Sequence, residues 1–372
     1  MRGASGGNPV RAMNRRRFLL TSALASVSAA TARGWSLPSL EPARADDWRT
    51  FEVTTRVEVR QPSGMTRVWM PEALTEDTPF QRTLANVVQA EGGTATVTKQ
   101  SPDALAIVSV SFPAGVPPVL TLTSRVSTRD YAVDLSGPNH EAAPQTLDYF
   151  RRPTKFIPTS GIVQSTALEI TKGAQSDIDK ARAIYEWVVD RTSRNPQTRG
   201  CGTGNIRFML ESGDLSGKCA DINSLFVGLA RASGLAARDA YGLRVAPSRE
   251  GYKSLGTASD NVTKAQHCRA EVYASGYGWV PVDPADVRKV ALEEPPGHRP
   301  LDDEMVKQAR ARLFGSWEMN WMAYNFAQDV ELPGSGSAIP FLMYPQAETG
   351  GTRVDSLDPE AFHYEISARE IG

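Results

Sequence analysis

Residues 51–59 alternate between hydrophobic and polar character. Every even position is polar, and the hydrophobic residues occupy odd positions only: Phe51, Val53, Val57 and Val59. A period of two is typical of a half-buried β-strand. Shorter β-type runs lie at 66–70, 95–98, 105–112 and 119–126, separated by turn-forming Pro, Gly and Asp residues. The pattern predicts a small, sandwich-like β-rich domain over residues 46–135, without a catalytic constellation of its own.

The pattern changes after residue 135. Prolines recur through residues 136–160, which we interpret as a linker or wrapping segment. Ser176 and Asp179 then form a capping-box pattern, and the hydrophobic residues after them recur at helical spacing up to about residue 195. Residues 198–214, with three glycines between 200 and 204, are expected to be irregular.

The strongest helical pattern lies between Gly217 and Gly234. Its hydrophobic residues recur at i, i+3, i+4 and i+7, which predicts a helix with one buried face: Ile222, Leu225, Phe226 and Leu229. Cys219 falls on the first turn, where unpaired N–H groups and the positive end of the helix dipole favour a thiolate. From this stretch alone, a buried structural cysteine remains the alternative.

Further elements follow the cysteine helix. A strand is predicted over 238–245, and two short β-type runs, 266–273 and 278–283, are joined by a Gly-containing turn as a hairpin. A helix over 302–313 and a strand over 362–371 are expected near the C-terminus. The aromatic residues between them are expected to pack in the core or between domains, with the lining of a substrate cleft as the alternative: Trp317, Trp321, Tyr324 and Phe326.

Charge is unevenly distributed along the chain. The net charge of the 372 residues is −1, but residues 1–45 contain seven Arg against the single acid Glu41. The remaining part is therefore acidic, which argues against a nucleic-acid partner. The hydrophobic fraction of 41% and charged fraction of 22% are those of an ordinary globular protein.

Residues 1–45 have the features of an export signal. Arg15-Arg16-Arg17 precede Phe18-Leu19 and a short apolar run, and Ala43-Arg44-Ala45 fits a cleavage site. The segment resembles a twin-arginine signal peptide. No later stretch has the roughly 18 consecutive apolar residues of a membrane span. We therefore expect a mature protein in the periplasm or secreted, without a membrane span.

A thiol nucleophile needs a base and a group that orients the base. Of the four histidines, His267 begins one strand of the predicted hairpin and Asp283 ends the other. We predict a catalytic triad of Cys219, His267 and Asp283. Asp221 is too close to Cys219 along the helix to orient the base, and we expect it to anchor a neighbouring loop or cap the helix.

Three blocks of sequence resemble the transglutaminase-like superfamily: Gly217-Lys218-Cys219-Ala220-Asp221, His267 with Glu271-Val272-Tyr273, and Gly278-Trp279-Val280-Pro281-Val282-Asp283-Pro284. They occur in the family's order. The resemblance implies a papain-like α+β fold, with the cysteine helix packed on a sheet that carries the His and Asp. It also implies acyl transfer at an amide or ester carbonyl. Where the family often has an aromatic residue two positions after the His, this chain has Cys268 and Arg269, which we expect to alter the pocket wall.

The other two cysteines leave alternatives open. Cys201 and Cys268 could form a disulfide, Cys201 could pair reversibly with Cys219, or the two could be unrelated buried thiols. No Cys or His spacing typical of zinc and no calcium-loop motif is present. We therefore predict no metal and no cofactor.

These observations define one expectation and one alternative. We expect an exported cysteine enzyme that acts on amide bonds of a protein or peptide, peptidoglycan peptides included, by hydrolysis rather than crosslinking. The catalytic core is predicted at 161–298, with a C-terminal extension, 299–372, packed on it. The alternative is a non-catalytic binding or scaffold protein of the same fold.

Overall fold

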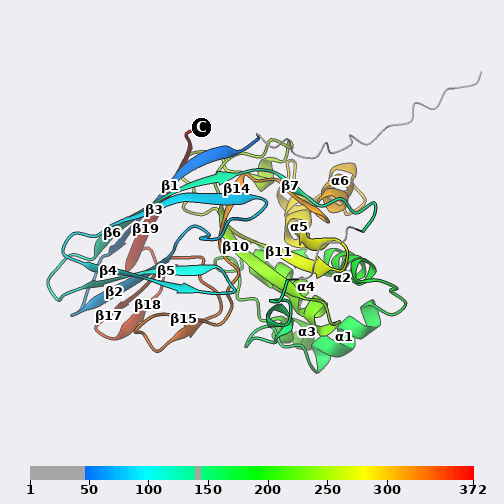
Figure 1. The fold of residues 1–372 in the computed structure, drawn as a ribbon, viewed down its shortest axis with the longest axis horizontal. Coiled ribbons are helices and arrows are strands. Elements are labelled where there is room, and N and C mark those ends of the chain that lie inside the picture. The colour runs from blue at the N-terminus through cyan, green and yellow to red at the C-terminus, as the bar shows by residue number, and fades with distance from the viewer. Residues whose placement is uncertain (1–46, 139–143) are drawn as a thin grey trace, which may run out of the picture. The chain divides into compact units, whose positions relative to one another are not determined.

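The computed structural model describes residues 47–138 and 144–372. The predicted export signal and His140 lie outside the described residues. The described chain is a mixed α+β structure in which two sheets form a β-sandwich and a third sheet packs against helices (Figure 1). The predicted fold class is confirmed.

The sandwich begins with the strands that the period-two pattern predicts. Its first six strands are β1 (Arg49–Val59), β2 (Thr66–Pro71), β3 (Gln81–Gln89), β4 (Thr94–Gln100), β5 (Leu105–Phe112) and β6 (Val119–Thr128). The odd-numbered side chains from Phe51 to Val59 are buried, and the even-numbered ones are not. Apolar side chains of both sheets form the interior between them, and the few buried polar residues on these strands, such as Thr66 and Ser124, are uncharged.

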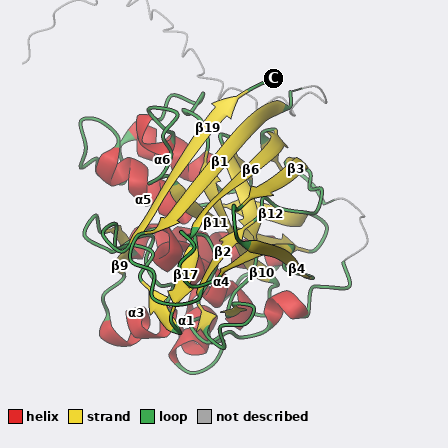
Figure 2. Ribbon diagram, turned by 90° about the vertical axis from the view of Figure 1, so that its left-hand side faces the viewer, coloured by secondary structure: helices red, strands yellow, loops and turns green. Residues whose placement is uncertain are grey.

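The C-terminal segment supplies strands to both sheets of the sandwich. One sheet has the order β19-β1-β6-β3 and the other β18-β17-β2-β5-β4, with β17 at Gln346–Thr349, β18 at Thr352–Val354 and β19 at Phe362–Glu370 (Figure 2). Strand β19 pairs antiparallel with β1 from Phe51 opposite Glu370 to Val59 opposite Phe362. The sequence indicated the strand but not its partner, and the predicted domain boundaries stay predictions.

Strand β3 is absent from the expected elements because its pattern is irregular. It lies at the edge of its sheet, and its pairing with β6 shifts register between Thr83 and Ala85. Such a bulge changes which side chains face the interior. Leu84 and Val87 are consequently exposed, and no simple alternation is left for sequence analysis to find.

The second half of the chain is built on a sheet of order β12-β11-β10-β14. Its strands are β10 (Ala237–Arg244), β11 (Gln266–Ala274), β12 (Gly278–Val282) and β14 (Trp321–Asn325). Helix α4 (Cys219–Ala232) packs on β10 and β11 and is itself covered by the other helices. These are α1 (Ile162–Ile170), α2 (Asp177–Arg191), α3 (Ile206–Ser212) and α5 (Pro284–Glu293); α6 (Glu304–Arg312) packs on α5.

Short elements connect these parts. They are the single turns η1 (Tyr149–Arg151) and η2 (Lys253–Leu255), and the strands β7 (Tyr131–Ala132), β8 (Ser193–Arg194), β9 (Ser216–Gly217), β13 (Ser316–Trp317), β15 (Val330–Glu331) and β16 (Ala338–Ile339). None of the helices in the described part of the chain has the length and apolar run needed to cross a membrane.

Helix α4 is more deeply buried than its pattern predicts. Every residue from Cys219 to Arg231 is buried, because the helix has the sheet on one side and helices on the other. Its polar residues must therefore find partners inside the protein. This burial brings Asp221 and Asn223 into the interior beside Cys219.

The structure contains two helices, α3 and α5, that the sequence analysis did not predict. Residues 198–214 were expected to be irregular, but α3 occupies Ile206–Ser212, with Asn205 as its N-cap and Gly213 in the left-handed conformation after it. Helix α5 starts directly after Asp283 and was not expected. Helix α2 begins with the predicted Ser176 cap but ends at Arg191, before the predicted stop near residue 195.

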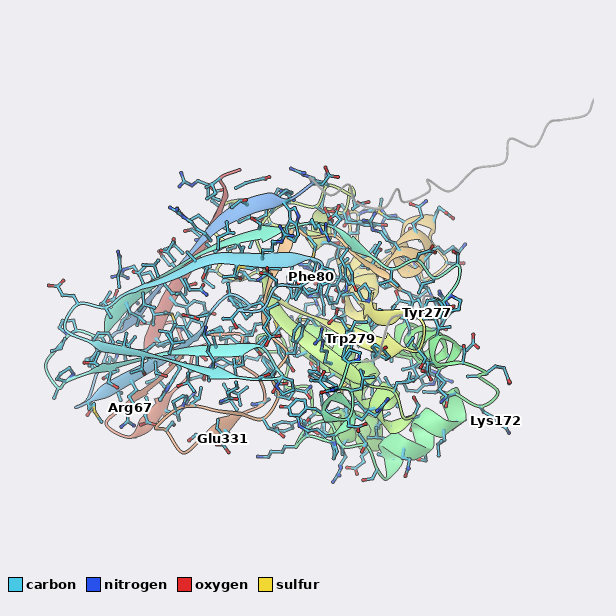
Figure 3. All side chains as sticks on the ribbon, viewed as in Figure 1. Arg67, Phe80, Lys172, Tyr277, Trp279 and Glu331 are labelled. Atoms are coloured by element: carbon cyan, nitrogen blue, oxygen red, sulfur yellow. The ribbon has the colours of Figure 1, made fainter. Side chains whose placement is uncertain are left out.

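The aromatic run packs where the sandwich meets the second half, as predicted. Trp317 and Trp321 are fully buried in a cluster that also contains Phe80 of the sandwich segment (Figure 3). The rings of Phe80 and Trp317 meet edge to face with centroids 5.5 Å apart.

Candidate active site

Cys219 is the first residue of α4, and the loop before the helix is tied to it by Asp221. The Asp221 carboxylate accepts hydrogen bonds from the N–H groups of Lys218, Thr203 and Gly204, at 3.0–3.1 Å. This is the loop-anchoring role expected of Asp221. Gly202 has a φ of +93°, and a Cβ there would lie 1.9 Å from the carboxylate, so this close approach requires glycine.

The anchored loop brings a second thiol to the nucleophile. Ala220 donates its N–H to the carbonyl of Cys201 at 2.9 Å, and the Cys201 thiol donates to the Gln266 carbonyl at 3.4 Å. Cys201 and Cys268 both lie near enough to Cys219 to lower the pKa of its thiol. All three cysteines are buried and unbonded to one another covalently. The structure thus contains no Cys201–Cys268 disulfide, and the two are not unrelated thiols either. They are neighbours of Cys219.

The electrostatic surroundings of Cys219 favour the thiolate. Hydrogen bonds from Cys201 and Cys268 lower the pKa of Cys219 well below its ordinary value, burial opposes the shift, and a hydrogen bond and the charge of His267 assist it. The position at the start of a helix acts in the same direction. Among the described residues the Cys219 N–H has no acceptor, so it remains able to donate to a substrate oxygen.

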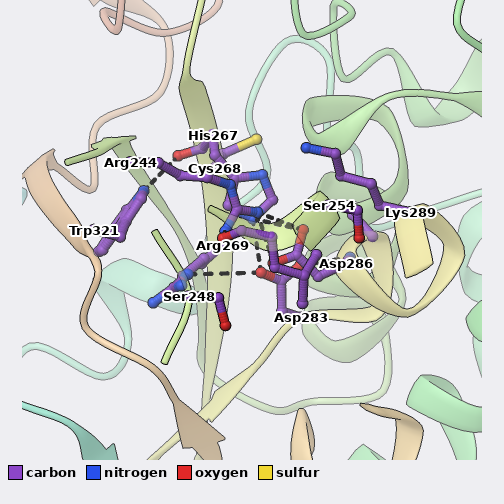
Figure 4. A network of polar contacts seen from close by, with 12 residues as sticks. Arg244, Ser248, Ser254, His267, Cys268, Arg269, Asp283, Asp286, Lys289 and Trp321 are labelled. Atoms are coloured by element: carbon purple, nitrogen blue, oxygen red, sulfur yellow. Dashed lines mark hydrogen bonds and ion pairs between the residues drawn. The ribbon is translucent and has the colours of Figure 1, made fainter. Parts of the chain in front are cut away.

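His267 is held by the end of the neighbouring strand. Its Nε2 lies 2.7 Å from Oδ2 of Asp283, and its carbonyl accepts a hydrogen bond from the Trp321 indole at 2.9 Å (Figure 4). His267 lies on β11, and Asp283 directly follows β12, the strand paired with it. Cys219 and His267 line the same cavity, and the charge of His267 helps to lower the pKa of the thiol. The three residues of the predicted triad are therefore brought together.

Asp283 has a second role as the N-cap of α5. Its Oδ1 accepts hydrogen bonds from the Asp286 N–H and from the Asn223 side chain, both at 3.1 Å. The Asn223 amide also donates to the Cys268 carbonyl at 2.8 Å and accepts from the Ala285 N–H at 3.2 Å. One asparagine on the cysteine helix thus fixes the carboxylate, the histidine strand and the start of α5.

Three further buried charged groups surround the His267–Asp283 pair. Asp286 lies 3.4 Å from His267 Nε2, and its two oxygens accept from Nη2 of Arg244 at 2.6 and 2.7 Å. Arg269 lies 3.7 Å from Asp283 and stacks over the rings of Trp317 and Trp321. Each of these charges has an opposite charge within 4 Å, as burial requires.

This network sets the protonation of the histidine. Burial and the charge of Arg244 act to lower the pKa of His267, but the carboxylates of Asp286 and Asp283 outweigh them and raise it. Burial and the neighbouring Asp286 raise the pKa of Asp283, whereas Arg244 and His267 outweigh burial and hold the pKa of Asp286 well below its usual range. A raised His267 pKa beside a lowered Cys219 pKa favours a thiolate–imidazolium pair.

The same side chains have the spacing of a metal site but not its chemistry. Ligand atoms of His267, Asp283 and Asp286 lie within 4.8 Å of one another. The guanidinium of Arg244 occupies both oxygens of Asp286, and Asp283 already accepts from His267, Asn223 and a backbone N–H. These contacts describe an ion-pair network rather than a set of donors available to a cation.

A cavity of about 690 Å³ opens onto the thiol. Cys219 and His267 line it together with residues 256–259 and 261–266 and with six residues between 356 and 364, a segment that runs into β19. Cys268 and Arg269 are not among its lining residues. As neighbours on β11 their side chains point to opposite faces of the sheet, Cys268 toward Cys219 and Arg269 toward Trp317 and Trp321. The expectation that they alter the pocket wall is therefore wrong. Their role is to support the nucleophile and the carboxylate.

Sequence reasoning missed Asn223, Arg244 and Asp286. Asn223 stands four residues after Cys219, the spacing that puts two side chains on one face of a helix. Asp283 followed by Pro284 is the signature of an N-cap and first helical residue, and would have revealed α5 and with it Asp286. No signal in the sequence marked Arg244, whose partner is 42 residues away.

Comparison with known proteins supports a shared fold. Residues 164–284 match the model of the transglutaminase-like superfamily. An uncharacterized protein of Haemophilus influenzae is 38% identical over 232 residues, which cover 60% of this chain and 62% of that protein. The matched region thus spans less than two thirds of this relative.

Two solved structures extend the comparison at low identity. A putative cysteine protease of Cytophaga hutchinsonii is 13% identical, with a TM-score of 0.52 over 88% of this chain and 92% of that one. The periplasmic domain of TgpA from Pseudomonas aeruginosa is 15% identical, with a TM-score of 0.34 over 68% and 93% of the two chains. The first of these likenesses supports the fold, and the sequence match places a transglutaminase-like core at residues 164–284 of this chain.

Proposed function

We propose that this protein is an exported cysteine hydrolase that cleaves amide bonds of peptides through Cys219, His267 and Asp283. One observation carries the proposal. Cys219 at the start of α4 lines one cavity with His267, whose charge helps to lower the thiol pKa and whose Nε2 lies 2.7 Å from Asp283. Nucleophile, base and orienting acid in this relation are the requirements of covalent acyl transfer. The description of the Cytophaga hutchinsonii protein as a putative cysteine protease agrees with a peptide substrate.

The reaction follows from the protonation states. The Cys219 thiolate attacks the carbonyl carbon, and the carbonyl electrons move to the oxygen, which the Cys219 N–H stabilises. The bond to nitrogen then breaks while His267 gives its proton to the leaving amine, which leaves a thioester on Cys219. Neutral His267 next takes a proton from water, the resulting hydroxide attacks the thioester, and the carboxylic acid leaves with the thiolate restored.

Hydrolysis is preferred to crosslinking because it requires only water as the second substrate. Transamidation needs an amine bound beside the thioester, and no group in the site is assigned to that task. The export signal predicted at residues 1–45 would deliver the enzyme to the periplasm or the medium, where peptide substrates include peptidoglycan peptides.

The test combines a peptide library with a labelled amine, incubated with the wild-type protein and with Cys219→Ala. We expect cleaved peptides with the wild type and a loss of about 10³-fold or more in the variant, as for removal of a nucleophile in other triads. Asp214→Asn, a change to an exposed acid outside the cavity, serves as the control and should leave cleavage unchanged.

The other outcomes contradict the proposal in different ways. Amine adducts in place of cleaved peptides would identify a transamidase. No product from either protein, with peptides retained, would identify a binding protein of this fold. Cleavage that persists in Cys219→Ala would show that Cys219 is not the nucleophile.

A further inference from the structure

The cavity at Cys219 is lined by basic residues and by no acidic one. Six of its lining residues are Lys or Arg: Arg194, Arg199, Lys218, Arg244, Lys264 and Lys289. No Asp or Glu of the described chain belongs to the lining. This contrasts with the sequence after residue 45, in which acidic residues outnumber basic ones. The positive charge is thus concentrated at the candidate active site rather than spread over the protein.

The acids behind the lining do not balance these cations. Arg194 and Lys289 share the single carboxylate of Glu293. Arg199 pairs with Asp355 at 2.7 Å, and Arg244 with Asp286 at 2.6 Å. Within the described part of the chain, neither Lys218 nor Lys264 forms an ion pair. These two lysines are partly or fully exposed, so their charges are available to a ligand.

Lys289, which shares the Glu293 carboxylate with Arg194, illustrates the excess of positive charge. The Lys289 amine lies 3.9 Å from Glu293, and its side chain is only 19% exposed. Burial and the nearby charge of Arg244 lower the pKa of Lys289 to about 8. The amine remains protonated at neutral pH but would gain from a further negative charge in the cavity.

The free lysines stand next to the reacting groups in sequence. Lys218 directly precedes Cys219, and Lys264 lies three residues before His267, in the segment that lines the cavity between residues 256 and 267. A ligand carbonyl at Cys219 would therefore have cationic side chains of two separate segments beside it. A positively charged cleft raises the local concentration of anionic ligands and selects against cationic ones.

We propose that this cleft selects peptides that carry carboxylates next to the amide bond presented to Cys219, with Lys218 and Lys264 as the specificity-determining residues. The inference rests on the proposed function for the bond that is attacked. Acidic side chains and a free C-terminus are two sources of such carboxylates with the same chemistry. Neutral peptides of the same length bind more weakly, and lysine-rich peptides are rejected.

Binding is measured with the full chain carrying Cys219→Ala, so that no probe is consumed. Three labelled peptides are compared by fluorescence anisotropy: Ala-Glu-Ala-Glu-Ala amide, Ala-Gln-Ala-Gln-Ala amide, and the Gln peptide with a free C-terminal carboxylate. Glu and Gln have nearly the same shape, so the first two differ in charge alone. We expect at least one anionic peptide to bind about tenfold more tightly than the neutral amide at low salt, and this ratio to fall at high salt.

Variants that remove one positive charge test whether Lys218 and Lys264 cause the preference for anionic peptides. Lys218→Gln and Lys264→Gln should each reduce the ratio of affinities about threefold, and the double variant should nearly abolish it. Lys172→Gln is the matched control, because Lys172 is exposed and lies outside the cavity lining (Figure 3). It should leave the ratio unchanged. Thermal unfolding of each variant confirms that the protein is folded at the assay temperature.

The outcomes separate this inference from the proposed function. Equal affinity for all three peptides, or a preference that survives in the double variant, overturns the inference even if the enzyme cleaves peptides. A preference for the Glu peptide locates the carboxylate on side chains, and one for the free acid locates it at the C-terminus; either supports the inference. A charge preference in a protein that cleaves nothing overturns the proposed function alone.

Discussion

The interior of the sandwich and the interior behind Cys219 differ in composition. Between the two sheets of the sandwich the buried cluster is made of apolar side chains such as Val68 of β2 and Phe112 of β5, and the buried Thr66 and Ser124 beside it carry no charge. Behind Cys219, five ionisable side chains are 4% exposed or less: Arg244, His267, Arg269, Asp283 and Asp286. Both regions are well packed, but only the first is stabilised mainly by the removal of apolar surface from water.

The difference shows how function constrains a core. An apolar interior tolerates many side chains of suitable volume, because its interactions are not directional. A buried charge tolerates few changes, since each group must keep its partner. Such a network contributes little net stability when intact. Here it raises the pKa of His267 and holds the ring in one orientation against Asp283.

The largest effect is expected from removing a buried charge without its partner. Arg244→Met leaves the Asp286 carboxylate buried without its guanidinium and should lower the free energy of unfolding by about 3–5 kcal/mol. Arg56→Met, which breaks the exposed Arg56–Glu58 pair of the sandwich, should cost less than about 1 kcal/mol. Urea denaturation of the two variants measures both values. Similar losses would remove the distinction between the two regions.

A smaller effect is expected in the sandwich. Leu120→Ala creates a cavity at a side chain that is 1% exposed and should cost about 2–3 kcal/mol. The rate of Cys219 alkylation by iodoacetamide should not change below the unfolding temperature, because no charge near the thiol is altered. A slower rate in this folded variant would show that the sandwich interior also controls the site.

The smallest expected effect is a shift in the pH profile of that alkylation. Because the pKa of Cys219 is lowered, the rate should reach its plateau at a pH where an ordinary thiol is still protonated. Asn223→Ala frees Asp283 from its amide partner, weakens its hold on His267, and should move the midpoint of the profile upward by about 0.5–1 pH unit, or about 0.7–1.4 kcal/mol.

Two controls complete the pH experiment. Thr121→Ala changes a partly buried polar residue in the sandwich strand β6 and should leave the midpoint in place. His267→Ala removes the imidazolium and should raise the midpoint further than Asn223→Ala does. A wild-type midpoint at the ordinary thiol value would contradict the proposed ion pair.

Regular patterns allowed much of the fold to be predicted. The period of two in β1 and the helical spacing in α4 each reflect a local chain facing one apolar interior, so both are visible in sequence. Strand β3 was missed because its bulge breaks the alternation. The partner of β19 was missed because pairing between distant segments leaves no periodic signal in either.

The residues of the candidate site also divide into those that a local pattern predicts and those that depend on contacts between distant segments. Cys219, His267 and Asp283 were found because each has a recognisable position at the start or end of an element. Arg244 and Asp286 were not, because what defines them is a contact between β10 and α5. Asn223 lies between these cases, since its spacing from Cys219 was visible but its partners were not.

The pairing of β19 with β1 also has a consequence for how the chain folds. The partners Phe51 and Glu370 are separated by almost the whole described sequence, so the sheet cannot be completed until the last strand has left the ribosome. Phe362, His363 and Tyr364 of that strand also line the cavity at Cys219. Assembly of the cleft is thereby delayed until synthesis is nearly finished, and a chain that stops before β19 would carry the nucleophile without one wall of its cleft.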